Sequence, residues 1–137
     1  MALDKAGEQF EAGTLFLPQL MNAAETAQCA FEVLQEAIAK TGAEKLSGGK
    51  ILVATVEGDI HDIGKNIVKM MLEGKGLEVV DLGTDVSPET FVQTAIEQNC
   101  QIICCSALLT TTMGVMEDVV KKAIEMGVRD KVKIMIG

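Results

Sequence analysis

The only histidine of the chain, His61, lies in an acidic segment with two glycines, Glu57-Gly58-Asp59-Ile60-His61-Asp62-Ile63-Gly64-Lys65-Asn66. A carboxylate from Asp59 or Asp62 can accept a proton from one imidazole nitrogen and leave the other as a basic lone pair, as in metal-bound histidines. One histidine gives one metal bond, so a zinc site with three or four protein ligands is poorly supported. A metal that is ringed by its own macrocycle needs only one. The alternative is a surface-loop histidine with acidic neighbours, which composition alone favours.

The same segment could be a phosphate-binding loop, because it joins a predicted strand to a predicted helix. It lacks the GxGxxG pattern and the GK[ST] ending. Asp59 and Asp62 would also repel an anion at the start of the helix. Phosphate binding is therefore disfavoured.

A second polar segment begins at Ser106 and runs Ser106-Ala107-Leu108-Leu109-Thr110-Thr111-Thr112-Met113. Thr111 and Thr112 precede a predicted helix and can be helix caps. Ser106 ends a predicted strand, which places its hydroxyl within reach of Asp59 and His61 if the two strands are neighbours.

The elements that must position these residues alternate between short apolar runs and helical stretches, which is typical of a parallel sheet with crossover helices. We expect an α/β fold, a doubly wound parallel sheet of the flavodoxin or Rossmann type that is truncated after its fourth strand and is buried on both faces. Ligands of such sheets bind beyond the carboxyl ends of the strands. The predicted strands are 51–56, 77–82, 101–106 and 132–136, and the predicted helices are 65–75, 88–98 and 114–126.

The N-terminal third has apolar residues at spacings of three and four, which predicts two amphipathic helices broken between residues 13 and 18. Pro18 suits the first turn of the second helix, and Thr14 is a candidate cap. We expect three parts: a helical cap at 1–42, a linker at 43–49 and an α/β domain at 50–137.

Composition excludes several classes of function. The formal net charge of −8 leaves no basic surface for nucleic acid, and no apolar stretch approaches the roughly 20 residues of a membrane span. We therefore expect no nucleic-acid or membrane partner and a cytoplasmic protein. Cys29, Cys100, Cys104 and Cys105 form no CxxC pair, and Cys104 and Cys105 lie inside an apolar run, where we interpret them as small buried hydrophobic residues.

Together, these motifs resemble the signature of cobalamin-binding domains. Asp59-x-His61-x-x-Gly64, then Ser106-x-Leu108, then Gly137 after the fourth strand resemble the DxHxxG, SxL and GG motifs, although only one glycine of the last pair is present. Residues 7–20 are similar to the second half of the four-helix cap of methionine synthase and of corrinoid proteins. The resemblance implies that both ends of the family's fold lie outside this chain.

The resemblance implies a role for each matching residue. His61 would be the lower axial ligand of cobalt, Asp59 would hold its far nitrogen, and Ser106 would hold Asp59. Ser106 and Thr110 would hydrogen-bond a cobalamin or related corrinoid, and Leu108 would line the slot for the nucleotide tail. The other implied cofactor contacts are Gly58, Ile60, Asp62, Ile63, Gly64 and Gly137, together with Phe10, Leu17 and Leu20 of the cap, for which core packing is the alternative.

The implied function is that of a corrinoid carrier subunit, not a complete enzyme. It would bind cobalamin base-off and His-on and shuttle a methyl group through Co(I) and methyl-Co(III). The implied partners are a substrate-specific methyltransferase, a methyltransferase that serves a folate, pterin or thiol acceptor, and a reductive activase. The alternatives are a cobalamin-dependent sensor or regulator and the cofactor domain of a cobalamin-dependent mutase.

Overall fold

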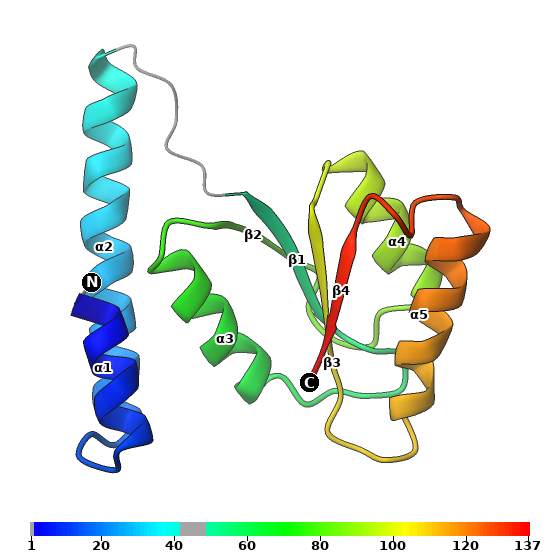
Figure 1. Cartoon of the computed structure of the whole chain (residues 1–137), viewed down its shortest axis with the longest axis horizontal. Helices are drawn as coiled ribbons and strands as arrows, with labels where there is room; N and C mark the ends of the chain where they lie inside the picture. The colour runs from blue at the N-terminus through cyan, green and yellow to red at the C-terminus, as the bar shows by residue number, and fades with distance from the viewer. Residues whose placement is uncertain (1, 42–48) are drawn as a thin grey trace. The chain divides into compact units, whose positions relative to one another are not determined.

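The computed structural model describes residues 2–41 and 49–137, which divide into two compact units (Figure 1). One unit contains the two N-terminal helices and residues 70–77, and the other contains residues 49–69 and 78–137. The predicted linker at 43–49 falls almost wholly outside the described residues. In the described part of the chain, no helix is long and apolar enough to cross a membrane.

The first unit is built on α1 (Ala2–Glu11) and α2 (Leu17–Thr41), as the apolar spacing predicts. Leu3 of α1 and Leu20 of α2 are both buried, at 6% exposure each. The prediction that Thr14 caps α2 is wrong, because its hydroxyl donates to the carbonyl of Gln9 in α1 (3.0 Å). The backbone N–H of Phe16, just before α2, instead donates to the Gln19 side chain (2.8 Å), which is half of a capping box.

The second unit is an α/β sheet whose element order agrees with the prediction. The strands β1 (Lys50–Thr55), β2 (Glu78–Asp81), β3 (Ile102–Ser106) and β4 (Lys133–Ile136) are all parallel, in the order β2-β1-β3-β4. The helices are α3 (Ile63–Glu73), α4 (Pro88–Glu97) and α5 (Met113–Glu125). Each strand and each helix lies within two residues of its predicted bounds.

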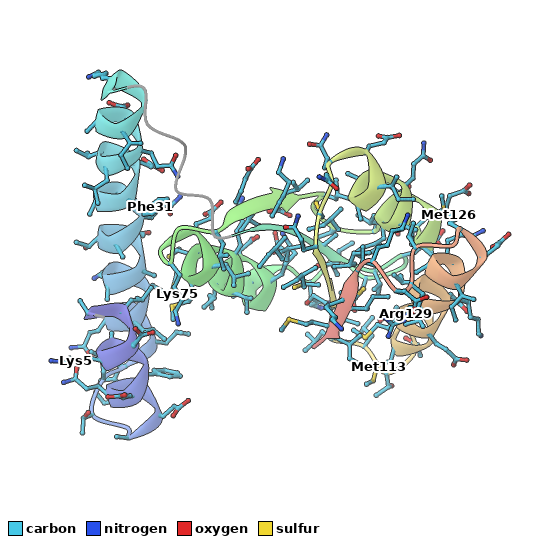
Figure 2. All side chains as sticks on the ribbon, turned by 45° about the horizontal axis from the view of Figure 1, so that its top comes forward. Lys5, Phe31, Lys75, Met113, Met126 and Arg129 are labelled. Atoms are coloured by element: carbon cyan, nitrogen blue, oxygen red, sulfur yellow. The ribbon has the colours of Figure 1, made fainter. Side chains whose placement is uncertain are left out.

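The apolar core lies on one face of this sheet, between the strands and the helices α4 and α5. Leu52 and Ile103 from the strands pack there with Phe91 of α4 and Val119 of α5, and all four are fully buried. Met113 and Met126 mark the two ends of α5 in Figure 2. The first half of α3 lies on the opposite face (Figure 1).

The prediction that every strand is buried on both faces holds for β1 and is wrong for β4. In β1 all residues after Lys50 are buried, whereas Met135 and Ile136 of β4 are 58% and 67% exposed. Among the described residues of this unit, α3 is the one helix on the face away from α4 and α5 (Figure 1), and its Lys65 and Lys69 pair with Asp81 of β2. The part of that face over β3 and β4 therefore stays open.

Candidate functional site

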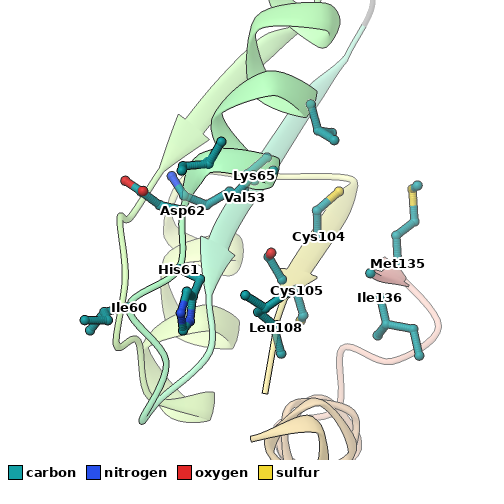
Figure 3. A pocket seen from close by; sticks show the side chains of 16 residues that line it. Val53, Ile60, His61, Asp62, Lys65, Cys104, Cys105, Leu108, Met135 and Ile136 are labelled. Carbon is teal, nitrogen blue, oxygen red and sulfur yellow. The ribbon is translucent and has the colours of Figure 1, made fainter. Parts of the chain in front are cut away.

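The open part of the sheet forms a groove of about 710 Å³ at the carboxyl ends of the strands. Its floor contains Val53, Cys104 and Met135, which are paired across β1, β3 and β4 and so form one row. Figure 3 shows His61 on one side of the groove, Met135 and Ile136 on the other, and Cys104 between them. A strand pattern of period two turns these side chains to one face, and the result is a largely apolar cleft beside one imidazole.

His61 follows β1 in the loop before α3, and its ring is held by the buried carboxylate of Asp59. Oδ1 of Asp59 lies 2.6 Å from Nδ1 of His61 and 3.0 Å from its backbone nitrogen. A carboxylate only accepts hydrogen bonds, so the neutral ring keeps its proton on Nδ1 and leaves the lone pair on Nε2. The contact expected between these two side chains is therefore present.

The other oxygen of Asp59 is held by the loop after β3. Oδ2 accepts from the backbone N–H groups of Leu108 (2.9 Å) and Leu109 (3.1 Å) and from the hydroxyl of Thr112 (2.9 Å). The expectation that Ser106 holds Asp59 is wrong, because Thr112 does so. Thr112 stands at the N-cap of α5 without a side-chain capping bond, and its hydroxyl lies 2.9 Å from Oδ2 of Asp59 and 2.9 Å from the carbonyl of Leu109.

These contacts keep Asp59 ionised although it is fully buried. The hydrogen bond from the backbone N–H of His61 has the largest effect and lowers the pKa of Asp59, while burial of the carboxyl opposes it. The His61 ring and the N–H groups of Leu109 and Leu108 lower the pKa further, so that it lies well below its ordinary value. A negative charge therefore stays beside Nδ1 at neutral pH.

The main chain of His61 is fixed from the strand as well. The hydroxyl of Thr55, the last residue of β1, donates to the carbonyl of His61 (2.9 Å). Within the described residues, Nε2 is then the one polar group of His61 without a hydrogen-bond partner. The His61 side chain is 47% exposed, so this lone pair is accessible.

The loop after β2 fastens the histidine loop from a third side. The backbone N–H of Gly58 donates to Oδ1 of Asp85 (2.7 Å), and the backbone N–H of Asp85 donates to the carbonyl of Asp59 (3.0 Å). Gly58 has φ +82°, a conformation that glycine adopts readily. Its function in the structure is thus to shape the loop.

The residues predicted to contact a cofactor fall into three groups. The groove is lined by Ile60, His61, Asp62, Ile63, Gly64, Ser106, Leu108 and Gly137. Gly58, Asp59 and Thr110 are not among its lining residues; Gly58 and Asp59 belong to the loop that carries His61 and are held there by Asp85 and Thr112. In the first unit, Leu20 is buried, and Phe10 and Leu17 are each 40% exposed.

Several residues of the site were not predicted from the sequence. Lys65 of α3 has a side chain that is only 1% exposed, and its ammonium group lies 2.7 Å from Asp81 and 2.8 Å from the Asn66 side chain. Thr55 and Thr112 were not singled out for Asp59 or His61 either. The sequence signal for Thr55 and Thr112 was that each is a hydroxyl residue at the edge of a loop that carries predicted site residues.

Of the four cysteines, Cys100 and Cys105 are buried, Cys104 is half-buried and Cys29 is exposed, so burial supports a structural role for Cys100 and Cys105. Burial, with a smaller contribution from Cys104, raises the pKa of Cys105 to about 12, and burial raises that of Cys104. Among the described residues there is no cluster of three or more histidine, cysteine, aspartate or glutamate side chains that could hold a metal ion.

The geometry fits a metal that brings its own equatorial ligands. A single imidazole offers one lone pair, next to an apolar groove of about 710 Å³, within the range of roughly 300–1,000 Å³ that is typical of small-molecule and cofactor pockets. Ile60, Ile63 and Leu108 line that groove and are 75%, 78% and 68% exposed. Such exposed apolar side chains around one cleft indicate a binding surface.

Comparison with known proteins agrees with this geometry. Residues 49–137 match a family model described as B12 binding domain, and residues 1–35 match a second model of the same description. Trimethylamine corrinoid protein 1 of Methanosarcina acetivorans is 47% identical over 98% of this chain, which spans 62% of that relative. Dimethylamine corrinoid protein 3 of Methanosarcina mazei is 44% identical over 98% of this chain, which spans 80% of that relative.

Solved structures give the same result. A cobalamin-binding protein from Desulfitobacterium hafniense DCB-2 superposes with a TM-score of 0.83 at 38% identity, covering 98% of this chain and 62% of its own. The methanol:cobalamin methyltransferase complex of Methanosarcina barkeri contains a chain that superposes with a TM-score of 0.81 at 31% identity. The match covers 98% of the present chain and 50% of the chain in that complex. The family match over residues 49–137 includes Asp59, His61 and every residue that lines the groove. The chain therefore belongs to the B12-binding domain family.

Proposed function

We propose that this chain is the corrinoid-binding part of a methyl carrier, in which His61 ligates cobalt through Nε2. The observation that supports this most directly is the restraint on His61. Asp59 engages its Nδ1 at 2.6 Å and its N–H at 3.0 Å, and Thr55 engages its carbonyl at 2.9 Å, so that the free lone pair belongs to a fixed ring. The family and the names of the relatives support the choice of cofactor.

The residues of the site would divide the work as follows. Asp59 would keep a proton on Nδ1 of His61, so that Nε2 is free to act as a metal ligand, and Thr112 would keep Asp59 in place. The apolar floor of the groove, with Val53, Cys104 and Met135, would exclude water and hold the nucleotide tail of the cofactor. Gly64 leaves room there, because a Cβ atom at that position would meet no atom within 4 Å. A bound corrinoid would supply a cobalt ion that accepts and releases a methyl group.

We further propose that the methyl donor and acceptor are bound by partner proteins. The relatives named above are corrinoid proteins of trimethylamine and dimethylamine, and one structural neighbour is part of a methanol:cobalamin methyltransferase complex. These names support a methylamine or methanol as the source of the methyl group. A substrate-specific methyltransferase would load the carrier, a second one would pass the group to a folate, pterin or thiol, and a reductive activase would restore the cofactor.

The test is the visible spectrum of the chain reconstituted with methylcobalamin. We expect a base-off, His-on spectrum for the wild type and the loss of the axial-ligand signature in His61→Ala. Glu57→Ala is the matched control, because Glu57 is an exposed residue of the same loop outside the groove lining. The same spectrum in the wild type and in His61→Ala would contradict the assignment of the ligand.

A further inference from the structure

The hydroxyl of Thr55 is buried at the point where β1 ends and the histidine loop begins. Its side chain is 0% exposed, and Oγ1 donates to the carbonyl of His61 at 2.9 Å. A buried hydroxyl is costly unless it is hydrogen-bonded, and in the described part of the chain this is the bond that Oγ1 makes. The hydroxyl is therefore committed to His61.

Thr55 itself sits in a rigid part of the fold. Its N–H donates to the carbonyl of Gly83 (2.9 Å), its carbonyl accepts from the N–H of Val86 (3.1 Å), and it pairs with Ser106 in the sheet. Asp59, by contrast, belongs to the same loop as His61. Thr55 is thus the contact that ties the histidine directly to the sheet.

We propose that Thr55 is a positioning residue for His61, whose hydroxyl fixes the histidine main chain so that Nε2 stays aimed into the groove. The inference rests on the proposed function, in which Nε2 is the cobalt ligand. If only the ring of His61 were held and its main-chain carbonyl were not, the residue could move with the loop. Small displacements of a ligand weaken a metal bond.

Two substitutions separate this role from simple packing. Thr55→Val keeps the branched shape and removes the hydroxyl, whereas Thr55→Ser keeps the hydroxyl and removes a buried methyl group. If Thr55 acts by packing, the serine variant is the worse one, because it leaves a small cavity. If it acts through the hydrogen bond, the valine variant is the worse one for His61.

The experiment measures two quantities on the whole chain: hydrogen exchange of the His61 backbone N–H without cofactor, and affinity for methylcobalamin. In Thr55→Val, we expect the His61 backbone N–H to exchange about tenfold faster and methylcobalamin to bind about tenfold more weakly. In Thr55→Ser, we expect both quantities to stay within about twofold of the wild type. Wild-type behaviour of Thr55→Val, or a serine variant worse than the valine variant, would overturn the proposal. Should Thr55→Val not fold, Thr55→Ala replaces it, since it differs from Thr55→Ser only by the hydroxyl.

The exchange measurement does not involve the cofactor, so it separates this inference from the proposed function. Identical methylcobalamin spectra for the wild type and His61→Ala would reject cobalt ligation, and with it a role of Thr55 toward cobalt. Different spectra together with unchanged exchange and affinity in Thr55→Val would reject the role of Thr55 alone.

Discussion

Replacing Asp59 by asparagine should move the ring proton of His61 from Nδ1 to Nε2. The carboxylate accepts two hydrogen bonds on Oδ1, both from His61, and three on Oδ2, from Leu108, Leu109 and Thr112. An asparagine side chain has one accepting oxygen and one donating amide group. When the asparagine oxygen points toward the loop after β3, its amide group faces only one backbone N–H, that of His61. The reverse orientation would set the amide against two backbone N–H groups and a hydroxyl.

The favoured orientation therefore points the amide at His61, where Nδ1 must accept and Nε2 must carry the proton. A protonated Nε2 has no lone pair for cobalt. Loss of such a supporting carboxylate costs about 10- to 100-fold in metal affinity, and we expect methylcobalamin to bind more weakly by that factor. Thr112→Val is the control for the position of the proton alone, because it removes one donor to Asp59 but keeps the carboxylate and hence the proton on Nδ1.

The tautomer can be observed directly, since His61 is the only histidine in the chain. Labelling histidine with ¹⁵N gives one pair of ring-nitrogen signals, and the two neutral tautomers exchange the protonated and unprotonated positions. The measurement needs a pH of about 8.5, well above the pKa of free imidazole. A proton that remains on Nδ1 in Asp59→Asn would refute the argument from hydrogen-bond geometry, whatever happens to the affinity.

Two further predictions concern the groove and the charges beside it. Gly64→Leu should weaken methylcobalamin binding without loss of stability, because Gly64 lines the groove and a Cβ there meets no atom within 4 Å. Gly114→Leu, at the same second position of α5 and outside the groove lining, should bind like the wild type; equal binding by both variants would contradict the prediction. Asp81→Asn should lower the free energy of unfolding by about 3 kcal/mol at neutral pH, because it leaves the Lys65 ammonium buried without its carboxylate. Burial alone would raise the pKa of Asp81, but hydrogen bonds from Lys65, Gly83 and Lys69 lower it, so this stabilisation is present above about pH 4 and is lost as the pH falls further. Urea unfolding at neutral and acid pH should show the difference narrowing, and a difference that widens in acid would reverse the assigned sign.

The sequence predicted the strands and helices well because buried apolar runs and helical periodicity are local features. It could not predict how the loop after β3 turns. Ser106 and Thr112 both offer a hydroxyl near Asp59, but Ser106 is the last residue of a strand and lines the groove. A turn in which the N–H of Thr112 donates to the carbonyl of Leu109 brings Thr112 back over the carboxylate. That choice depends on tertiary contacts.

The exposure of β4 was missed for a related reason. Its sequence, Lys133-Ile134-Met135-Ile136, is as apolar as that of a central strand. An apolar run shows that a strand can be buried, but not whether a helix or a bound ligand covers its second face. The exposure of Met135, at the end of the row that begins at the buried Val53, is the consequence, and only the structure reveals it.

The contacts of Asp59 explain why its carboxylate is fully buried although its neighbour Ile60 in the same loop is exposed. Asp59 gathers donors from its own loop and from the loop after β3, and its carbonyl accepts from Asp85 in the loop after β2. Three loops that follow three different strands are thus joined at one residue. A buried carboxylate is stable only when its hydrogen-bond donors are in place, so folding fixes the ring of His61 beside the groove with Nδ1 on Asp59. The cofactor would then meet a ligand whose orientation has already been fixed by folding, and little of its binding energy would be needed to order the loop.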